Sequence, residues 1–226
     1  MNRAVTAKPG PPNALGRIFA SEVPFLAIWN VLRSTVLKAK SSLMSAVLQA
    51  PGLYLGPGCV LRGSKFTKIG RNFYVHGHLW MEAITAYQQQ RFCPSIRIGN
   101  NVSFSEGVHI TCIDSISIGN GALFGSRVYV SDHNHGSYKG EIQSHPSEQP
   151  SLRALGGGGA VMIGDDVWIG DNVVIVGPVT IGQGSIVAAN SVVRTDIPAF
   201  TMVGGIPART IRRFDQQASR WERPNP

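Results

Sequence analysis

The sequence has few cysteines and few acidic residues, and it lacks a long apolar run. Its three cysteines, Cys59, Cys93 and Cys112, are odd in number and irregularly spaced, which excludes a disulfide framework and a cysteine-based zinc site. The apolar run at residues 23–32 is too short to span a bilayer, and residues 1–16 lack the apolar core of a signal peptide. We therefore expect a cytoplasmic protein in a reducing compartment.

The 13 acidic residues are outnumbered by 21 lysines and arginines, which gives a net charge of +8. Much of the excess lies in residues 1–50 and from Arg194 to the end. Such charge suits a nucleic acid, an anionic membrane or a phosphorylated ligand. The basic residues are not interleaved with aromatic ones as they are on single-strand-binding surfaces, so we expect no nucleic-acid partner.

Residues 163–197 repeat with a strict period of six. An aliphatic residue opens each unit: Ile163, Ile169, Ile175, Ile181, Val187 and Val193. Neither a helix, with its period of 3.6, nor a strand, with its period of 2, produces this pattern. A period of six is typical of a hexapeptide β-helix. Three short strands and their corners return the chain to a point about 4.8 Å above its start, so the aliphatic residues stack inside a prism.

The repeat extends towards the N-terminus with interruptions. Well-defined coils open at Ile69, Ile98, Ile118, Ile163 and Ile181, and a poorer coil precedes them. The step from residue 110 to residue 118 is eight, so one corner carries two extra residues. Residues 87–95 interrupt the repeat, and a polar loop interrupts it again at about 136–160. We interpret this loop as a flap beside a site, with an insertion of no such role as the alternative.

Both ends of the chain are predicted to contain helices. Residues 1–50 are expected to be a disordered start followed by a helical segment at 17–49. This segment either caps the first coil or rests on a membrane face as a basic amphipathic helix, and both interpretations stay open. Residues 51–205 are predicted to form the β-helix. Pro207 and an apolar face that includes Trp221 predict a C-terminal helix and tail within residues 206–226.

Histidines gather where the repeat is broken. His133 and His135 lie in the sequence SDHNHG at the mouth of the loop, and His109 lies one coil earlier at an equivalent side of the prism. The stacking brings Asp114 near Asn134. A histidine at such an edge can take a proton from a hydroxyl, and a carboxylate can hold its ring. Solvated corner histidines are the alternative.

The motifs DHNHG, VWIG and GGIPAR, within about residues 66–212, resemble the hexapeptide-repeat acyltransferases, above all the sugar, lipopolysaccharide and exopolysaccharide O-acetyltransferases. The resemblance implies an all-β fold, a left-handed parallel β-helix, although parallel crossovers are otherwise right-handed. It implies transfer of an acetyl group from acetyl-CoA to a hydroxyl of a sugar in a surface polysaccharide or its precursor. In the family a histidine at the place of His133 is the general base, with His135 as second choice, and no metal is expected.

The resemblance also places the thioester cofactor in a groove between subunits, which implies a homotrimer. The matching positions, with Arg194 added for its charge, are Trp168, Gly170, Asp171, Ala189, Arg194, Thr195, Arg209 and Arg212. Small residues let a pantetheine arm approach the backbone, and arginine side chains form bidentate hydrogen bonds with phosphates. Galactoside-type members carry an acceptor-binding Asn where this chain has Gly107. The acceptor therefore stays open, with an antibiotic or an amino acid as the alternative to a sugar.

Two further interpretations concern the same fold. A metal enzyme similar to the γ-type carbonic anhydrases would need three histidines that converge between subunits, for which His76, His78, His109, His133 and His135 are available. His76 and His78, however, are expected on a different side of the prism from His109 and His133. The other interpretation is a β-helix scaffold without catalytic activity.

Overall fold

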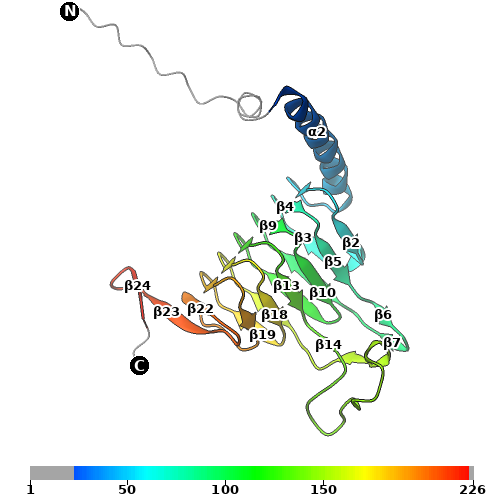
Figure 1. The fold of residues 1–226 in the computed structure, drawn as a ribbon, viewed down its shortest axis with the longest axis vertical. Coiled ribbons are helices and arrows are strands. Elements are labelled where there is room, and N and C mark those ends of the chain that lie inside the picture. Colours follow the sequence, from blue (N-terminus) through cyan, green and yellow to red (C-terminus); the bar gives the residue numbers. More distant parts are fainter. Residues whose placement is uncertain (1–22, 224–226) are drawn as a thin grey trace, which may run out of the picture.

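The computed structural model describes residues 23–223, and these consist mainly of short strands that wind around a prism. Figure 1 shows the strands stacked coil upon coil between helix α2 (Pro24–Val47) and the C-terminal strands. The predicted disordered start and the last three residues of the predicted tail fall on residues 1–22 and 224–226, which lie outside the described residues.

Three sheets form the sides of the prism. The first sheet has the strand order β1 (Tyr54–Leu55), β4 (Tyr74–Gly77), β9 (Ser103–Glu106), β12 (Leu123–Phe124), β17 (Trp168–Ile169), β20 (Ile186–Val187), β22 (Thr201–Gly204), β23 (Arg209–Asp215) and β24 (Arg220–Glu222). The second has the order β2 (Val60–Arg62), β5 (Trp80–Ala83), β10 (His109–Cys112), β13 (Tyr129–Ser131), β18 (Val174–Val176) and β21 (Val192–Val193). The third has the order β19 (Val179–Ile181), β16 (Val161–Ile163), β11 (Ser115–Ile118), β8 (Ser95–Ile98) and β3 (Thr67–Ile69).

The residues that open the six-residue units stack in columns inside the prism. In the third sheet the partners in direct register are Ile69, Ile98, Ile118, Ile163 and Ile181. In the first they are Leu55, Val75, Phe104, Phe124, Ile169 and Val187, and in the second Met81, Ile110, Val130, Ile175 and Val193. All of these side chains are buried. The predicted coil positions are confirmed, and three parallel sheets are typical of the predicted left-handed β-helix.

A polar ladder joins the coils at the corner that follows the third sheet. The backbone N–H of Arg71 donates to Asn100 Oδ1 (3.0 Å), that of Asn100 donates to Asn120 Oδ1 (2.9 Å), and that of Asn120 donates to Asp165 Oδ1 (2.6 Å). Corner N–H groups cannot all join a sheet ladder, so these side chains satisfy them. The Asn and Asp residues of the repeat thus hold the corners in register.

Two excursions leave the prism and contact each other. The hairpin of β6 (Ala86–Tyr87) and β7 (Gln90–Arg91) accounts for the first interruption, and β14 (Asn134–His135) pairs antiparallel with β15 (Leu155–Gly156) at the base of the long loop. The loop contains a 3₁₀ turn, η2 (Pro150–Leu152). Tyr87 donates its hydroxyl to Ser151 O (2.5 Å), and the Gln90 side chain bonds to both Leu155 O (2.9 Å) and Leu155 N (2.7 Å). The hairpin therefore anchors the longer loop.

The predicted C-terminal helix is wrong, because the chain forms strands β23 and β24 there. β23 pairs antiparallel with β22, and Phe214 faces Trp221 across the next strand pair, with ring centroids 5.4 Å apart. Burial along the first six residues of β23 alternates residue by residue, which is the strand period. The free edge of β22 offers unpaired backbone groups, and this pairing overrides the helical spacing of the apolar residues.

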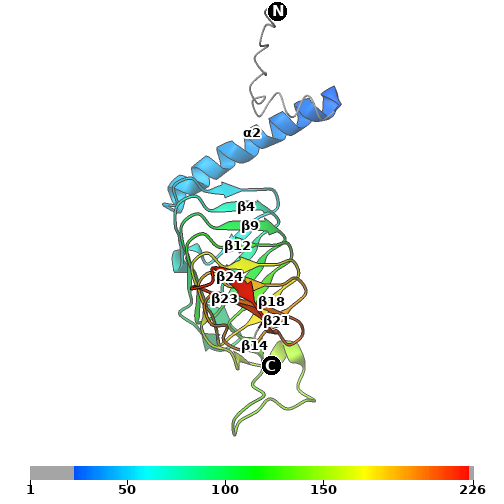
Figure 2. The same cartoon turned by 90° about the vertical axis from the view of Figure 1, so that its left-hand side faces the viewer.

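Helix α2 covers the first coil only with its C-terminal turns. Pro24 stands in its first turn, where the missing N–H costs no hydrogen bond. Ser41 Oγ accepts from Leu55 N (2.9 Å), and Met44 and Leu48 pack against the core. The N-terminal half leans away from the prism (Figure 2). The predicted cap is thus confirmed only for the second half. No helix within residues 23–223 combines the length and apolarity needed to cross a membrane.

The tight corner at Gly119 provides a test of this packing. A Cβ at Gly119 would lie 2.6 Å from the backbone N of Asp165 and from the backbone C of Gly164, so Gly119→Ala must push two coils apart. We expect this change to lower the free energy of unfolding by about 1–3 kcal/mol in denaturant titrations. Gly156→Ala is the matched control, because a Cβ there meets no atom within 4 Å. Equal stability of the two variants would contradict the packing.

Candidate active site

A buried carboxylate–imidazole pair lies where β13 ends and the chain leaves the prism. His133 Nδ1 is 2.8 Å from Asp132 Oδ1, and the two residues are only 7% and 1% exposed. The Ser131 hydroxyl donates to His133 O (2.8 Å) and accepts from His133 N (3.2 Å). An ionised carboxylate accepts hydrogen bonds only, so Nδ1 carries the proton and Nε2 is left to accept one.

The carboxylate of Asp132 is held by the corner one coil below. It accepts hydrogen bonds from Ile113 N (2.9 Å), Asp114 N (2.7 Å) and Cys112 Sγ (3.1 Å). Burial alone would raise the pKa of Asp132, but the hydrogen bonds from His133 and the two backbone N–H groups hold this pKa below its usual value. Burial and the Asp132 charge raise the pKa of the Cys112 thiol far above its ordinary range, so it remains a donor. Asp132 is therefore an ionised, fixed partner of His133.

The carboxylate that contacts the histidine is therefore Asp132, and the expectation for Asp114 is wrong. Asp114 has an exposed side chain and contributes its backbone N–H rather than its carboxylate. The sequence feature that points to this arrangement is the eight-residue step from residue 110 to residue 118. Its two extra residues form the corner that supplies the N–H groups to Asp132.

His133 lines a cavity of about 310 Å³ on the outer side of the second sheet. The cavity wall also includes His109 and His135, so the structure brings all three histidines to one cavity. The His109 ring lies between two aromatic rings, with centroids 6.1 Å from Trp80 and 5.2 Å from Tyr129. Burial lowers the pKa of His109, and the Glu82 charge offsets this only in part. His109 is therefore a neutral imidazole at neutral pH.

The two excursions close one side of this cavity. Tyr87, from the hairpin, lies against His135 with ring centroids 5.4 Å apart, and the Tyr138 hydroxyl donates to His135 O (2.5 Å). The returning loop passes directly over the site, since Gly159 N donates to Asp132 O (2.8 Å). A Cβ at Gly158 would lie 1.8 Å from that same oxygen, so the glycine run permits the approach. The long loop therefore lies beside the His133 cavity, and its action as a flap stays a prediction.

Several residues of this cavity were not predicted from the sequence. These residues lie on both excursions and on the second sheet: Ile84, Tyr87, Thr111, Tyr129, Asn134 and Leu155. For Tyr87 the available sequence feature was the interruption of the repeat at 87–95, to which no role had been assigned. For Thr111 and Tyr129 the signal was their place in outward columns of the second sheet.

A second cavity, of about 280 Å³, adjoins the first through Asn134. Its lining contains two basic residues, Lys139 from the loop and Arg194 from the corner after β21. Arg194 is one of the predicted cofactor residues, whereas Lys139 was missed. Cations beside the histidine cavity can hold an anionic group close to His133. Thr195 follows Arg194 at the same exposed corner.

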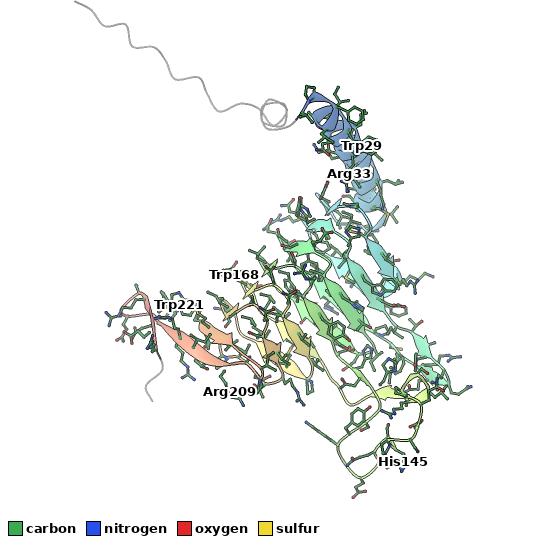
Figure 3. All side chains as sticks on the ribbon, in the orientation of Figure 1. Trp29, Arg33, His145, Trp168, Arg209 and Trp221 are labelled. Carbon is green, nitrogen blue, oxygen red and sulfur yellow. The ribbon has the colours of Figure 1, made fainter. Side chains whose placement is uncertain are left out.

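Most of the other predicted cofactor residues lie on a different side of the subunit. Trp168 points outward from the first sheet, and Figure 3 shows it and the loop with His145 at separate edges of the prism. Gly170 stacks closely on Ala189, and Asp171 Oδ1 accepts from Ser126 N (2.5 Å) at the corner between the first and second sheets. One strand of the second sheet separates this corner from His133.

Arg209 and Arg212 belong to β23, at the C-terminal end of the first sheet. Arg212 is half-buried, and its guanidinium donates to Trp221 O (3.4 Å). One subunit therefore brings only Arg194 and Thr195, among the eight predicted cofactor residues, to the corner of His133.

The histidines that a γ-carbonic-anhydrase-like site would need are not brought together within a subunit. His76 and His78 both approach Glu106 and line a separate cavity of about 640 Å³ under helix α2. Within residues 23–223, no three His, Cys, Asp or Glu side chains are grouped as metal ligands.

Known proteins resemble this chain in sequence and in structure. Residues 160–195 match the bacterial transferase hexapeptide family of six repeats. The "Putative lipopolysaccharide biosynthesis O-acetyl transferase WbbJ" of Escherichia coli (strain K12) is 36% identical over 166 residues, which are 73% of this chain and 81% of WbbJ. The galactoside O-acetyltransferase of the same organism is 29% identical over 159 residues, 67% of this chain and 66% of that protein.

A solved structure extends this likeness to three dimensions. It is a hexapeptide-repeat-containing acetyltransferase from Vibrio cholerae O1 biovar eltor, complexed with acetyl coenzyme A. The TM-score is 0.51 at 28% identity, and the match covers 79% of each chain. Since WbbJ is matched at 36% identity over 81% of its length, and since the six-residue register builds three parallel sheets here, this chain belongs to the hexapeptide-repeat acetyltransferase family.

Proposed function

We propose that this protein transfers an acetyl group from acetyl-CoA to a hydroxyl of a sugar in a surface polysaccharide or its precursor. The observation that carries the proposal is the Asp132–His133 pair at the wall of a cavity. The likeness to WbbJ supports a lipopolysaccharide sugar as the acceptor, and the Vibrio cholerae complex supports acetyl-CoA as the donor.

In the proposed reaction His133 acts as the general base. Its Nε2 takes the proton from the acceptor hydroxyl while the oxygen attacks the carbonyl carbon of the acetyl thioester. The C–S bond then breaks, the coenzyme A sulfur leaves, and His133 returns the proton to that sulfur. Asp132 accepts from Nδ1–H throughout and stabilises the imidazolium that forms. No covalent intermediate with the protein is required.

The cavity around His133 suits a hydroxylated acceptor. The neutral His109, Thr111 and Tyr129 offer hydrogen-bonding groups along one wall, and Tyr87 offers another from the hairpin. The aromatic rings of Tyr87 and Tyr129 also present apolar surface to the C–H groups of a ring substrate. We propose that these residues orient the acceptor while His133 removes its proton.

The adjoining cavity suits the donor. Lys139 and Arg194 place two positive charges on its wall, which suit the phosphates of a coenzyme, and Asn134 lines both this cavity and that of His133. The predicted donor residues on the first sheet, such as Trp168 and Gly170, can reach the same cofactor only from a neighbouring copy. A groove between two subunits would unite both sets.

The outer surfaces of two sheets support such an assembly, and we propose a homotrimer. An outward column of the first sheet contains Tyr74, Leu123 and Trp168, which are 45%, 45% and 52% exposed. The second sheet carries Trp80 and Tyr129 outward, beside the His133 cavity. A closed ring joins two different faces of each copy, so the first sheet of one copy would cover the second sheet of the next.

The reaction is tested by incubating the protein with acetyl-CoA and a panel of acceptors. The panel contains sugars of surface polysaccharides and their precursors, together with chloramphenicol and free amino acids. We expect a mass increase of one acetyl group on a sugar, and a loss of at least about 100-fold in turnover in His133→Ala. Full turnover of this variant would contradict the base, and transfer to chloramphenicol alone would contradict the acceptor. Thermal melting of the variant checks its fold.

The role of Asp132 is tested by Asp132→Asn, with Asp114→Asn as the matched control. An amide at position 132 offers one acceptor oxygen in place of two and sets an NH₂ group against other donors. We expect kcat to fall at least about 100-fold in Asp132→Asn and to change by less than about twofold in Asp114→Asn. Similar rates in the two variants would refute the assignment of Asp132 as the residue that positions His133.

The assembly is tested by light scattering of the full chain. We expect a mass of three times the 24.3 kDa of one chain. Leu123→Glu would place a charge in the covered column, so we expect it to yield monomers and to abolish transfer. Met162→Glu is the control, since Met162 is 50% exposed on the third sheet and should leave the trimer intact. A fully active wild-type monomer would contradict the trimer.

A further inference from the structure

Helix α2 carries its large apolar residues on the side that faces away from its own subunit. Six of them lie within an arc of about 60° on the helix surface and are between 58% and 77% exposed: Phe25, Trp29, Leu32, Val36, Leu43 and Val47. We call these six residues the α2 stripe. A helix that lies on a protein core normally turns such a stripe inward. The opposite side of α2 instead holds small residues, among them the buried Ala27 and Ser41.

Most of the large apolar side chains of α2 therefore face away from the prism, which is the reverse of the usual arrangement. Ser41 uses its hydroxyl on the backbone of Leu55, and Ser45 donates to Ala50 O (2.7 Å), so polar side chains share the contact with the body with Met44, which packs against the core. The N-terminal half of the helix extends past the prism, with Trp29 and Arg33 on the part that leans outward (Figure 3). Neither the core nor the cavity of His133 involves the α2 stripe. Its apolar surface is available to a partner outside the subunit.

The charges around the α2 stripe are all positive. Arg33 and Lys40 flank one side of it, whereas Lys38 lies on the side of Ala27 and Ser41. Residues 23–81 contain seven lysines and arginines and no aspartate or glutamate. Lys65 and Lys68 of the first coil line the same surface hollow as Val47, at the end of the helix. Among the described residues, the N-terminal end thus carries unpaired basic residues beside the apolar stripe, whereas Arg62 pairs with Glu82 (3.8 Å) and Glu106 lines the cavity on the inner side of α2.

We infer that the α2 stripe docks on an anionic phospholipid surface, with the helix lying in the plane of the interface. Exposed Phe, Trp and Leu on one face with Lys and Arg beside them are the features of an interfacial helix. Anionic lipids attract each nearby lysine or arginine, and the apolar stripe enters the headgroup boundary. The prism remains in water, because only α2 and the basic first coil meet the lipid.

A second copy of the chain is the competing occupant. The steps of four and three residues between Phe25, Trp29, Leu32 and Val36 also suit a coiled coil. In a bundle of identical helices, however, Arg33 and Lys40 would meet no acidic side chain, because α2 contains none. Like charges at these flanking positions oppose association, whereas an anionic surface complements all of them.

The inference is tested by sedimenting the full chain with phospholipid vesicles, and it does not depend on the acceptor of the enzyme. We expect binding to vesicles of phosphatidylcholine with phosphatidylglycerol, and binding at least about tenfold weaker to phosphatidylcholine alone. The triple variant Trp29→Gln, Leu32→Gln, Val36→Gln should bind the anionic vesicles at least about tenfold more weakly. Met162→Gln, an exposed apolar residue on the third sheet, is the matched control and should bind like the wild type.

Three results would overturn the inference. The first is a wild-type chain that does not bind the anionic vesicles, or binds them only after residues 1–22 are removed. The second is a triple variant that binds as tightly as the wild type. The third is a pair of results: the wild type does not bind vesicles, and the triple variant has a different oligomeric state from the wild type in light scattering. This pair would assign the α2 stripe to contact with a second copy. Circular dichroism melting of the triple variant checks that its prism is intact.

Discussion

The stacking of like residues from one coil to the next is the constraint on which this structure depends. Each coil must return to the same three sides, because only then do the inward columns stay closed and the backbone ladders stay paired. The corners are held to the same spacing by side chains such as Asn100 and Asn120, which bind N–H groups of the neighbouring coil. A corner of different length cannot use these side chains, so its backbone N–H groups need other hydrogen-bond acceptors.

The candidate site is such a corner. Two extra residues, Ile113 and Asp114, turn their N–H groups towards Asp132, whose carboxylate is nearly without solvent. A buried charge is tolerated only where donors surround it, and here the donors also fix its direction towards His133. The regular coils contribute rigidity, and the irregular corner contributes the candidate site. The returning loop bonds to the backbone carbonyl of Asp132, so the chain that follows the site also covers it.

Different surfaces of the prism support the two proposed contacts, one with other copies of the chain and one with lipid. The first and second sheets carry outward apolar and aromatic residues, such as Leu123, Trp168 and Trp80, which support contact between copies in the assembly that we propose. The N-terminal end is apolar and basic, which supports contact with lipid. If both proposals hold, the trimer would bind a membrane surface through its α2 helices and would form its active-site grooves between subunits. A lipid-linked sugar precursor would then be present at the surface where the enzyme is bound.

The sequence alone determined the coils, because a period of six leaves each aliphatic opener, from Leu55 to Val193, one interior position. It also indicated His133, since the motif interrupts that period. It could not determine which carboxylate meets the histidine, because Asp132 and Asp114 differ only in where their corners turn. Nor could it exclude a C-terminal helix, since the free edge of β22 that converts those residues to strands exists only in the folded prism. Local patterns specify the repeat, whereas pairing between distant segments decides its exceptions.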